Sequence, residues 1–422
     1  MNMINVGIDW AEDDHQVCIL DGEGTTLEEF KIRDGATGVG RLHERIGRHV
    51  DEPDQVVIGI ETDRGLLVGA LVAAGYQVYA VNPMSVDRYR DRHATSGGKS
   101  DRGDAKVLAD LVRTDRHNHR TVAADSELLA AIKITARTHQ NLIWTRTRHT
   151  NQLRSTLREF YPAALEAFDE LTHRDALAIL AIAPPPEQGR RLSTAKIRAA
   201  LERAGRQRNL DTRAETIREA LRSEQLEAPP QLTAAFADTV AALVPLLITL
   251  NEQIARVETA LADRFEQHPD AELILSLPGL SIVLGARVLA EFGDAPNRYT
   301  DAKARRNYAG TSPITKASGR RHVVVARFAR NHRLADACDR WAGCALANEP
   351  GARAYHAGHN PDPDTTKKHA RRKLANKLVG LLHGVLEHRT PYDPDIAWHH
   401  WHHTTTPTED QIAARHLQPW SV

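Results

Sequence analysis

The sequence predicts an α/β domain at its amino-terminal end, a helical coiled-coil spacer after it, and a mainly α-helical carboxyl-terminal domain. Short β-branched runs alternate with amphipathic segments over residues 1–122, and apolar residues at heptad spacing follow in the middle of the chain. A chain of 422 residues also exceeds what one hydrophobic core usually serves, so more than one domain is expected.

Composition excludes several classes of protein. Lys and Arg number 55, as do Asp and Glu, so the net charge of zero neither favours nor excludes nucleic acid. Cys18, Cys338 and Cys344 are too few and too scattered for a disulfide framework or a four-cysteine zinc site. The start of the chain does not resemble a signal peptide, and we expect no membrane helix of ~20 apolar residues. These features predict a soluble, cytoplasmic protein.

The order of elements in the first domain predicts an RNase H-like fold. Three strands, a helix, and then strand, helix and strand follow one another, which is the order of that fold. The expected strands are 4–9, 16–20, 27–32, 55–60 and 76–82, and the expected helical segments are 37–50 and 66–74.

Four acidic residues fall where such a fold would gather them. Asp9 closes the first strand and Glu61 the fourth, and these strands are neighbours in an RNase H-like sheet. Asp101 and Asp104 are three residues apart, a spacing that places both on one face of a helix. Carboxylates suit Mg²⁺, with Mn²⁺ as an alternative, and two such ions ~4 Å apart would serve phosphodiester chemistry. Alternatively, each residue is simply a solvated turn residue.

The middle of the chain predicts long helices. One extends from Ser126 to Phe160 and carries a basic side. A second contains apolar residues at a 4-3-4-3-4 spacing, with Pro245 inside its first turn. This spacing favours either antiparallel pairing with the first helix or a short dimer seam. The spaced residues are Leu243, Leu247, Leu250, Ile254, Val257 and Leu261.

The carboxyl-terminal third contains features that favour nucleic-acid binding. The Leu-Pro-Gly-Leu turn at residues 277–280 resembles a helix–hairpin–helix turn, although a plain helix turn explains it equally. Residues 296–345 carry eleven Lys or Arg against three Asp, and 366–377 carry six more with no acid. Such residues neutralise phosphates. The candidates for contact with nucleic acid are Arg305, Arg306, Lys316, Arg320, Arg321, Arg327, Arg330, Lys367, Lys368, Arg371 and Arg372.

A serine lies inside the first basic cluster. Ser318 precedes Gly319, Arg320 and Arg321, so its hydroxyl would lie beside groups able to hold a phosphate. Ser-Gly is also a common turn. The tail from Thr390 is rich in Pro and His and predicts a partly ordered extension rather than a metal site.

The ordered motifs GID, IGIE, VNP, KSDRGDA, PGL and YAG…P…SG resemble the DEDD transposases of insertion sequence family 110, which include Piv-type DNA invertases. The likeness covers residues 3–115 and 270–350. It implies a RuvC-like domain whose Asp9, Glu61, Asp101 and Asp104 bind Mg²⁺. It also implies a transposase domain in which Ser318 attacks DNA. Because Gly310-Thr311-Ser312-Pro313 departs from the usual Gly-Leu-x-Pro, Ser312 is a second candidate.

The resemblance implies further partners and a division of the chain. In the family a structured RNA can pair with donor and target DNA, and dimers and tetramers combine the acids of one subunit with the serine of another. The expected domains are 1–122 (catalytic), 123–268 (spacer), 269–388 (transposase) and 389–422 (tail). The expected place of action is the nucleoid in the bacterial cytoplasm.

Two other functions stay open at this point. A RuvC-like junction nuclease would use metal-activated water and no serine. A nucleic-acid-binding protein with an inactive RNase H-like fold would cleave nothing. We expect a DNA recombinase that moves an insertion sequence.

Overall fold

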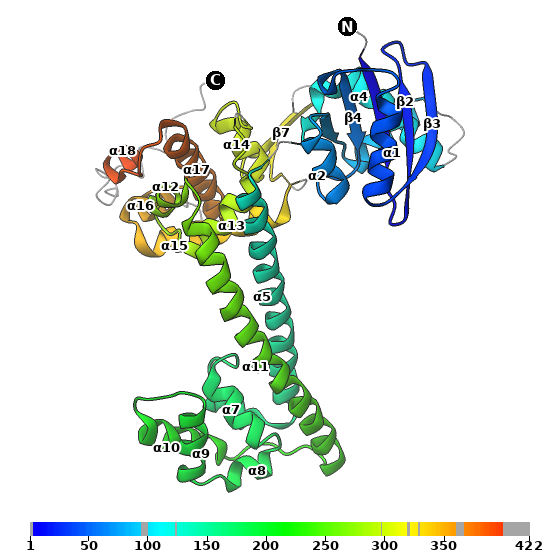
Figure 1. Ribbon diagram of the computed structural model, residues 1–422. Helices are drawn as coiled ribbons and strands as arrows, with labels where there is room; N and C mark the ends of the chain where they lie inside the picture. Colours follow the sequence, from blue (N-terminus) through cyan, green and yellow to red (C-terminus); the bar gives the residue numbers. More distant parts are fainter. Residues whose placement is uncertain are drawn as a thin grey trace. The chain divides into compact units, whose positions relative to one another are not determined.

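The computed structural model describes residues 3–93, 100–122, 125–296, 298–318, 321–327, 330–359 and 367–399. The chain divides into two compact units, residues 1–125 and 126–422 (Figure 1). The second unit contains two large hydrophobic clusters, one at each end, and the first unit is built around clusters of its own.

The first unit is built on a six-stranded sheet with the order β3-β2-β1-β4-β5-β6. β1 pairs antiparallel with β2 and parallel with β4, so the predicted contact between the first and fourth strands is confirmed. The strands are β1 (Ile4–Asp9), β2 (Asp14–Leu20), β3 (Thr26–Arg33), β4 (Val56–Ile60), β5 (Gln77–Ala80) and β6 (Arg120–Thr121). The helices are α1 (Ala36–Ile46), α2 (Leu66–Ala73), α3 (Pro83–His93) and α4 (Asp101–Asp115), with short 3₁₀ turns at Pro53–Gln55 and Arg116–Asn118.

Helices cover both faces of this sheet. Leu42 of α1 and Leu71 of α2 pack with the even-numbered residues of β1. α4 covers the opposite face and comes very close to two strands. A Cβ atom at Gly7 would lie 1.8 Å from the carbonyl oxygen of Ala105, so only glycine allows this approach. The close contact fixes α4 against β1.

Two long helices form the spine of the second unit. α5 (Glu127–Phe160) and α11 (Pro230–Glu266) lie side by side (Figure 1). His139 bonds Glu258 at 2.9 Å, and Arg146 donates to Asn251 at 2.9 Å, so the two helices run antiparallel. Of the two alternatives that the heptad spacing left open, pairing within the chain is therefore confirmed. Buried heptad positions of α11 include Leu243, Leu247, Ile254 and Leu261.

By length and composition alone, α11 is the one helix of the described chain apolar enough to cross a membrane. The apolar runs of the sequence predict no such helix. This is weak evidence for a span, because core helices pass the same test and α11 packs against α5.

At one end of the spine, five short helices enclose a core. Phe160, Leu180 and Leu201 are fully or almost fully buried there, together with Leu247 of α11. These helices are α6 (Pro162–Ala167), α7 (Arg174–Ile182), α8 (Pro186–Arg191), α9 (Thr194–Arg203) and α10 (Leu210–Leu221).

At the other end, helices surround a core that contains Trp341 and Leu378, and a hairpin follows α14 (Ala302–Ala309). Trp398 is fully buried in this core, although it belongs to the stretch 389–422 that the composition predicts to be a partly ordered tail. His400, Trp401, His402 and His403 lie outside the described residues. The elements are α12 (Ala271–Ser276), α13 (Ile282–Phe292), α14 (Ala302–Ala309), β7 (Ile314–Ser318), β8 (Arg321–Val325), α15 (His332–Asn348), α16 (Pro350–Gly358), α17 (Lys367–His388) and α18 (Pro394–Trp398).

The Leu-Pro-Gly-Leu turn joins α12 to α13 and packs against α15. A Cβ atom at Gly279 would lie 2.4 Å from the backbone nitrogen of Ala345, and Trp341 donates to the carbonyl of Pro278 at 2.8 Å. These contacts give the turn a packing role, which favours the plain helix turn over a phosphate-binding hairpin.

Candidate active site

The four predicted acidic residues lie at one edge of the first unit. Asp9 is the last residue of β1, and Glu61 directly follows β4. Because Ile8 pairs with Ile60 in the parallel register, these acids follow neighbouring strand positions. α4 runs antiparallel to both strands, since Arg116 at its far end contacts the sulfur of Met3 at 3.8 Å. Its first turn therefore lies at the edge where β1 and β4 end.

Local sequence explains where α4 begins. The Ser100 hydroxyl accepts a hydrogen bond from the Gly103 amide at 3.1 Å and so caps the helix. Asp101 and Asp104 occupy the first turn, where the helix dipole stabilises negative charge. The helix amino end thus brings two carboxylates toward the edge that carries Asp9 and Glu61.

The side chains at this edge have different surroundings. Asp104 is buried, and its Oδ1 accepts a hydrogen bond from Nη2 of Arg90 on α3 at 2.5 Å. Asp101 is exposed, whereas Asp9 and Glu61 are half-buried. Within the described ranges, no three His, Cys, Asp or Glu side chains lie close enough together to hold a metal ion. The donor chemistry of four carboxylates fits Mg²⁺, but the side chains are not gathered around one point.

Of the two candidate serines, Ser312 precedes β7 and Ser318 is its last residue. The backbone of Ser318 pairs with Arg321 of β8. Only the backbone of Lys316, Ser318 and Arg321 is described, and Gly319 and Arg320 lie outside the described residues. Ser312 is half-buried and donates to the amide oxygen of Asn376 at 3.4 Å. An amide oxygen is a poor base, so this contact does not activate the Ser312 hydroxyl.

Two of the predicted nucleic-acid contacts, Arg305 and Arg306, also pack within the fold. The Arg305 guanidinium stacks on the ring of Tyr299 at 4.5 Å and on that of Phe292 at 5.4 Å. Burial lowers the pKa of Arg305. Arg306 lies against the backbone of α17, where a Cβ atom at Gly380 would meet its guanidinium at 1.8 Å.

Other predicted contacts have different surroundings. Arg371 forms an ion pair with both carboxylate oxygens of Asp339. Arg327 donates to the amide oxygen of Asn307 over a long distance of 3.5 Å. The Lys367 side chain is not described. Arg330, Lys368 and Arg372 behave differently again, because all three line a cavity of about 250 Å³.

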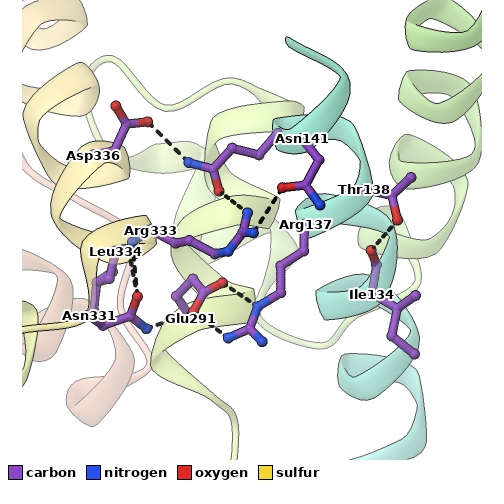
Figure 2. A network of polar contacts seen from close by, with 10 residues as sticks. Ile134, Arg137, Thr138, Asn141, Glu291, Asn331, Arg333, Leu334 and Asp336 are labelled. Atoms are coloured by element: carbon purple, nitrogen blue, oxygen red, sulfur yellow. Dashed lines mark hydrogen bonds and ion pairs between the residues drawn. The ribbon is translucent and has the colours of Figure 1, made fainter. Parts of the chain in front are cut away.

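A polar network that the sequence did not reveal joins α5, α13 and α15 (Figure 2). The buried Glu291 accepts two hydrogen bonds from Arg137, at 2.7 and 2.9 Å, and one from Asn331 at 2.7 Å. Burial alone would raise the pKa of Glu291, but these donors outweigh burial and lower it. Arg333 adds bonds to Gln140 and Asn141. The network fixes the start of α15.

Comparisons with known proteins agree with this architecture. A family model for DEDD transposases of the IS110 type matches residues 6–162, and a model described as "Transposase IS116/IS110/IS902 family" matches residues 271–357. The "Mini-circle putative transposase for IS117" of Streptomyces coelicolor is 44% identical over 93% of this chain and 96% of its own length.

Two further relatives come from insertion elements. The "Insertion element IS116 uncharacterized 44.8 kDa protein" of Streptomyces clavuligerus is 31% identical over 92% of this chain and 96% of its own length. The "Insertion element IS900 uncharacterized 42 kDa protein" of Mycobacterium paratuberculosis is 26% identical over the same shares. Together with the match to the IS117 protein over nearly the whole chain, these likenesses show that the chain belongs to the IS110 family of insertion-sequence transposases, enzymes that cut and rejoin DNA.

Proposed function

We propose that this transposase moves its insertion sequence through Mg²⁺-dependent attack of Ser318 on DNA, with Asp9, Glu61, Asp101 and Asp104 holding the metal. Mn²⁺ would serve in place of Mg²⁺. The observation that carries the proposal is the meeting of β1, β4 and the first turn of α4 at one edge. Three elements far apart in sequence each bring carboxylates to that edge, which a set of solvated turn residues would not require.

We assign the first unit to the RuvC-like branch of the RNase H-like folds. Its strand order begins β3-β2-β1-β4-β5, with the first three strands antiparallel and β4 and β5 parallel to β1. This topology is the one that the element order predicts, and it supports a nuclease-like use of the acidic edge.

The four carboxylates supply hard oxygen ligands, and a bound divalent ion would polarise the scissile phosphate and favour ionisation of the attacking hydroxyl. Arg90 already occupies Oδ1 of Asp104. Asp104 would therefore bind through Oδ2 or release Arg90 first. The half-buried Asp9 and Glu61 would complete the ligand set from the strand ends.

In the reaction, Oγ of Ser318 attacks phosphorus and loses its proton, while one deoxyribose oxygen leaves with the bonding electrons and takes up a proton. The new phosphoserine bond replaces the broken phosphodiester bond, so rejoining can proceed by the reverse attack without an external energy source. Arg320 and Arg321 would stabilise negative charge on the phosphate. The neutral partner of Ser312 supports the choice of Ser318.

The test is incubation of the full chain with Mg²⁺, element-end DNA and element-encoded RNA, followed by a denaturing gel before and after protease treatment. We expect a protease-sensitive DNA adduct that Ser318→Ala abolishes and Ser312→Ala preserves. Free nicked ends without adduct in every variant would instead assign the chain to junction nucleases that use water. Absence of any cleavage would favour a binding protein with an inactive RNase H-like fold.

Guidance by a structured RNA, assembly into dimers or tetramers and action at the bacterial nucleoid belong to the same proposal. These three parts of the proposal are supported by the resemblance of the sequence motifs to the family. Omitting the RNA from the same reaction tests guidance, because sequence choice should then be lost. Mixing Ser318→Ala with Glu61→Gln protein tests shared active sites, because mixed assemblies would regain activity only where subunits exchange groups.

A further inference from the structure

A cavity of about 250 Å³ lies in the carboxyl-terminal part of the second unit, where α14 ends and α15 and α17 begin. Its wall includes Thr311, so the cavity adjoins the segment that leads to β7. Three basic side chains contribute to the wall: Arg330, Lys368 and Arg372.

Arg330 is held firmly at this cavity. Gly310 has a φ of 70°, and a Cβ atom there would lie 2.5 Å from Cδ of Arg330, so the arginine stem packs directly on the glycine. Its Nε is buried and has no hydrogen-bond partner within the described part of the chain. A buried donor without a partner is costly unless a ligand supplies an acceptor.

The two carboxylates on the cavity wall are already engaged elsewhere. Asp336 accepts hydrogen bonds from Arg287 at 2.7 Å and from Arg340 at 3.1 Å. Asp339 is engaged by Arg371 through both of its oxygens. Arg330, Lys368 and Arg372 form no ion pair with an acid in the ranges that the structure describes. The cavity therefore carries an excess of positive charge.

Two helix ends and one pKa agree with this excess. His332 and Ala335, in the first turn of α15, line the cavity, and Lys368 belongs to the first turn of α17. Helix amino ends carry partial positive charge and favour anions. Burial and, secondarily, the charge of Arg330 lower the pKa of Arg372, and the charge of Asp339 offsets part of this effect. The positive charges of Arg330 and Arg372 therefore repel one another at the cavity wall.

We propose that this cavity binds one phosphate group of the DNA backbone and so anchors the DNA next to the segment that carries the serine. The proposal deepens the proposed function and rests on it for the identity of the ligand as DNA. Arginine forks and an ammonium group match phosphate oxygens, and a cavity of this size admits one phosphate group but no base pair.

The first test measures DNA binding of the full chain at increasing salt, without Mg²⁺ and without RNA. We expect Arg372→Met to weaken binding equally for all DNA sequences and to lower the slope of log affinity against log salt by about one. Lys373→Met removes the same charge from the neighbouring exposed position, which does not line the cavity, and should change the slope less. Equal changes in both variants would overturn the proposal.

The second test measures melting temperature at constant ionic strength with sulfate or chloride. We expect sulfate to stabilise the wild-type chain and Lys373→Met, but to lose this effect in Arg372→Met. Without sulfate, Arg372→Met should melt no lower than the wild type, because one of two repelling arginines is gone. Equal stabilisation by sulfate in all three proteins would contradict the site.

Two remaining outcomes identify other ligands. Stabilisation by sulfate with an unchanged DNA slope would assign the cavity to a free anion and overturn the proposal. A slope that changes only with RNA would do the same in favour of RNA phosphate. Both tests need no cleavage, so an inactive enzyme that passes them would refute the serine mechanism and leave the phosphate site standing.

Discussion

The acidic edge of the first unit and the basic cavity of the second unit differ in whether their charged side chains have a partner of opposite charge. At the edge, buried Asp104 has its counter-charge in Arg90 at 2.5 Å. In the cavity, Arg330 and Arg372 lie near one another and form no ion pair among the described residues. Asp336 and Asp339 accept hydrogen bonds from other arginines, although the charge of Asp339 still raises the pKa of Arg372. The cavity is therefore prepared for an anion from outside. The edge holds a carboxylate whose counter-charge the fold already supplies.

The comparison shows that basic side chains without a partner in the fold indicate a binding site better than the number of basic residues does. Of the predicted basic contacts, Arg305, Arg306 and Arg371 support aromatic rings, a helix backbone and an aspartate. Asp339 satisfies the guanidinium of Arg371, and aromatic rings cover that of Arg305, although Nε and Nη1 of Arg305 have no hydrogen-bond partner among the described residues. Basic side chains that neither form an ion pair nor stack on a ring keep their charge available for a phosphate.

The largest effect is expected from a substitution at the acidic edge of the first unit. Glu61→Gln should lower strand cleavage on the order of 10⁴-fold. The reason is that removing one member of a set of groups that act together in catalysis abolishes most of the activity. The melting temperature should stay near that of the wild type, since Glu61 is only half-buried. Gel assays of DNA cleavage measure the effect. Glu52→Gln, at an exposed site of the same unit, is the control. Cleavage by Glu61→Gln at the wild-type rate would remove Glu61 from the active site.

A smaller effect concerns a paired charge in the second unit. Glu291→Gln should cost about 3 kcal/mol of unfolding free energy near neutral pH, because Arg137 loses its buried partner. Folding lowers the pKa of Glu291, so its contribution is complete above the unfolded value of about 4.3. It disappears as the pH falls through the lower folded pKa.

Denaturant titration from neutral to acid pH measures this difference. The gap between Glu291→Gln and the wild type should close only at the acid end of the series. Exposed Glu272→Gln should follow the wild type throughout. A gap that is independent of pH would show that packing, rather than the ion pair, carries the effect.

The ion pair between Arg90 and Asp104 in the first unit allows a further test of paired charge. Arg90→Met should cost about 2 kcal/mol, less than Glu291→Gln, because solvent reaches 17% of the Arg90 side chain. Asp104→Asn should reduce this cost, and the two changes together should be less harmful than their sum. Arg88→Met, on the exposed side of α3, is the control in the same unfolding measurement. Strict additivity would contradict the ion pair.

Sequence patterns predicted the strand ends well and the partners of charged groups poorly. Asp9 and Glu61 follow apolar β-branched runs, and the structure confirms their strand-end positions, whereas their role as ligands stays a prediction. Asp104 and Arg90 meet because α3 packs on α4, which spacing along the chain does not encode. Likewise, the heptads of α11 suit an intramolecular helix pair and a dimer seam equally. Only the folded chain distinguishes these two arrangements.

The smallest expected effect separates a structural arginine from a binding arginine. Arg305→Met should cost about 1 kcal/mol, because the guanidinium no longer stacks on Tyr299 and Phe292. For Arg305→Met, the slope of log DNA affinity against log salt should equal that of the wild type. Arg372→Met should show the reverse pattern, with unchanged stability and a lower slope. Unfolding and DNA binding measured on both variants form a crossed comparison. If Arg305→Met also lowered the slope, stacking on aromatic rings would not prevent an arginine from holding phosphate, and the distinction between paired and available charge would fail.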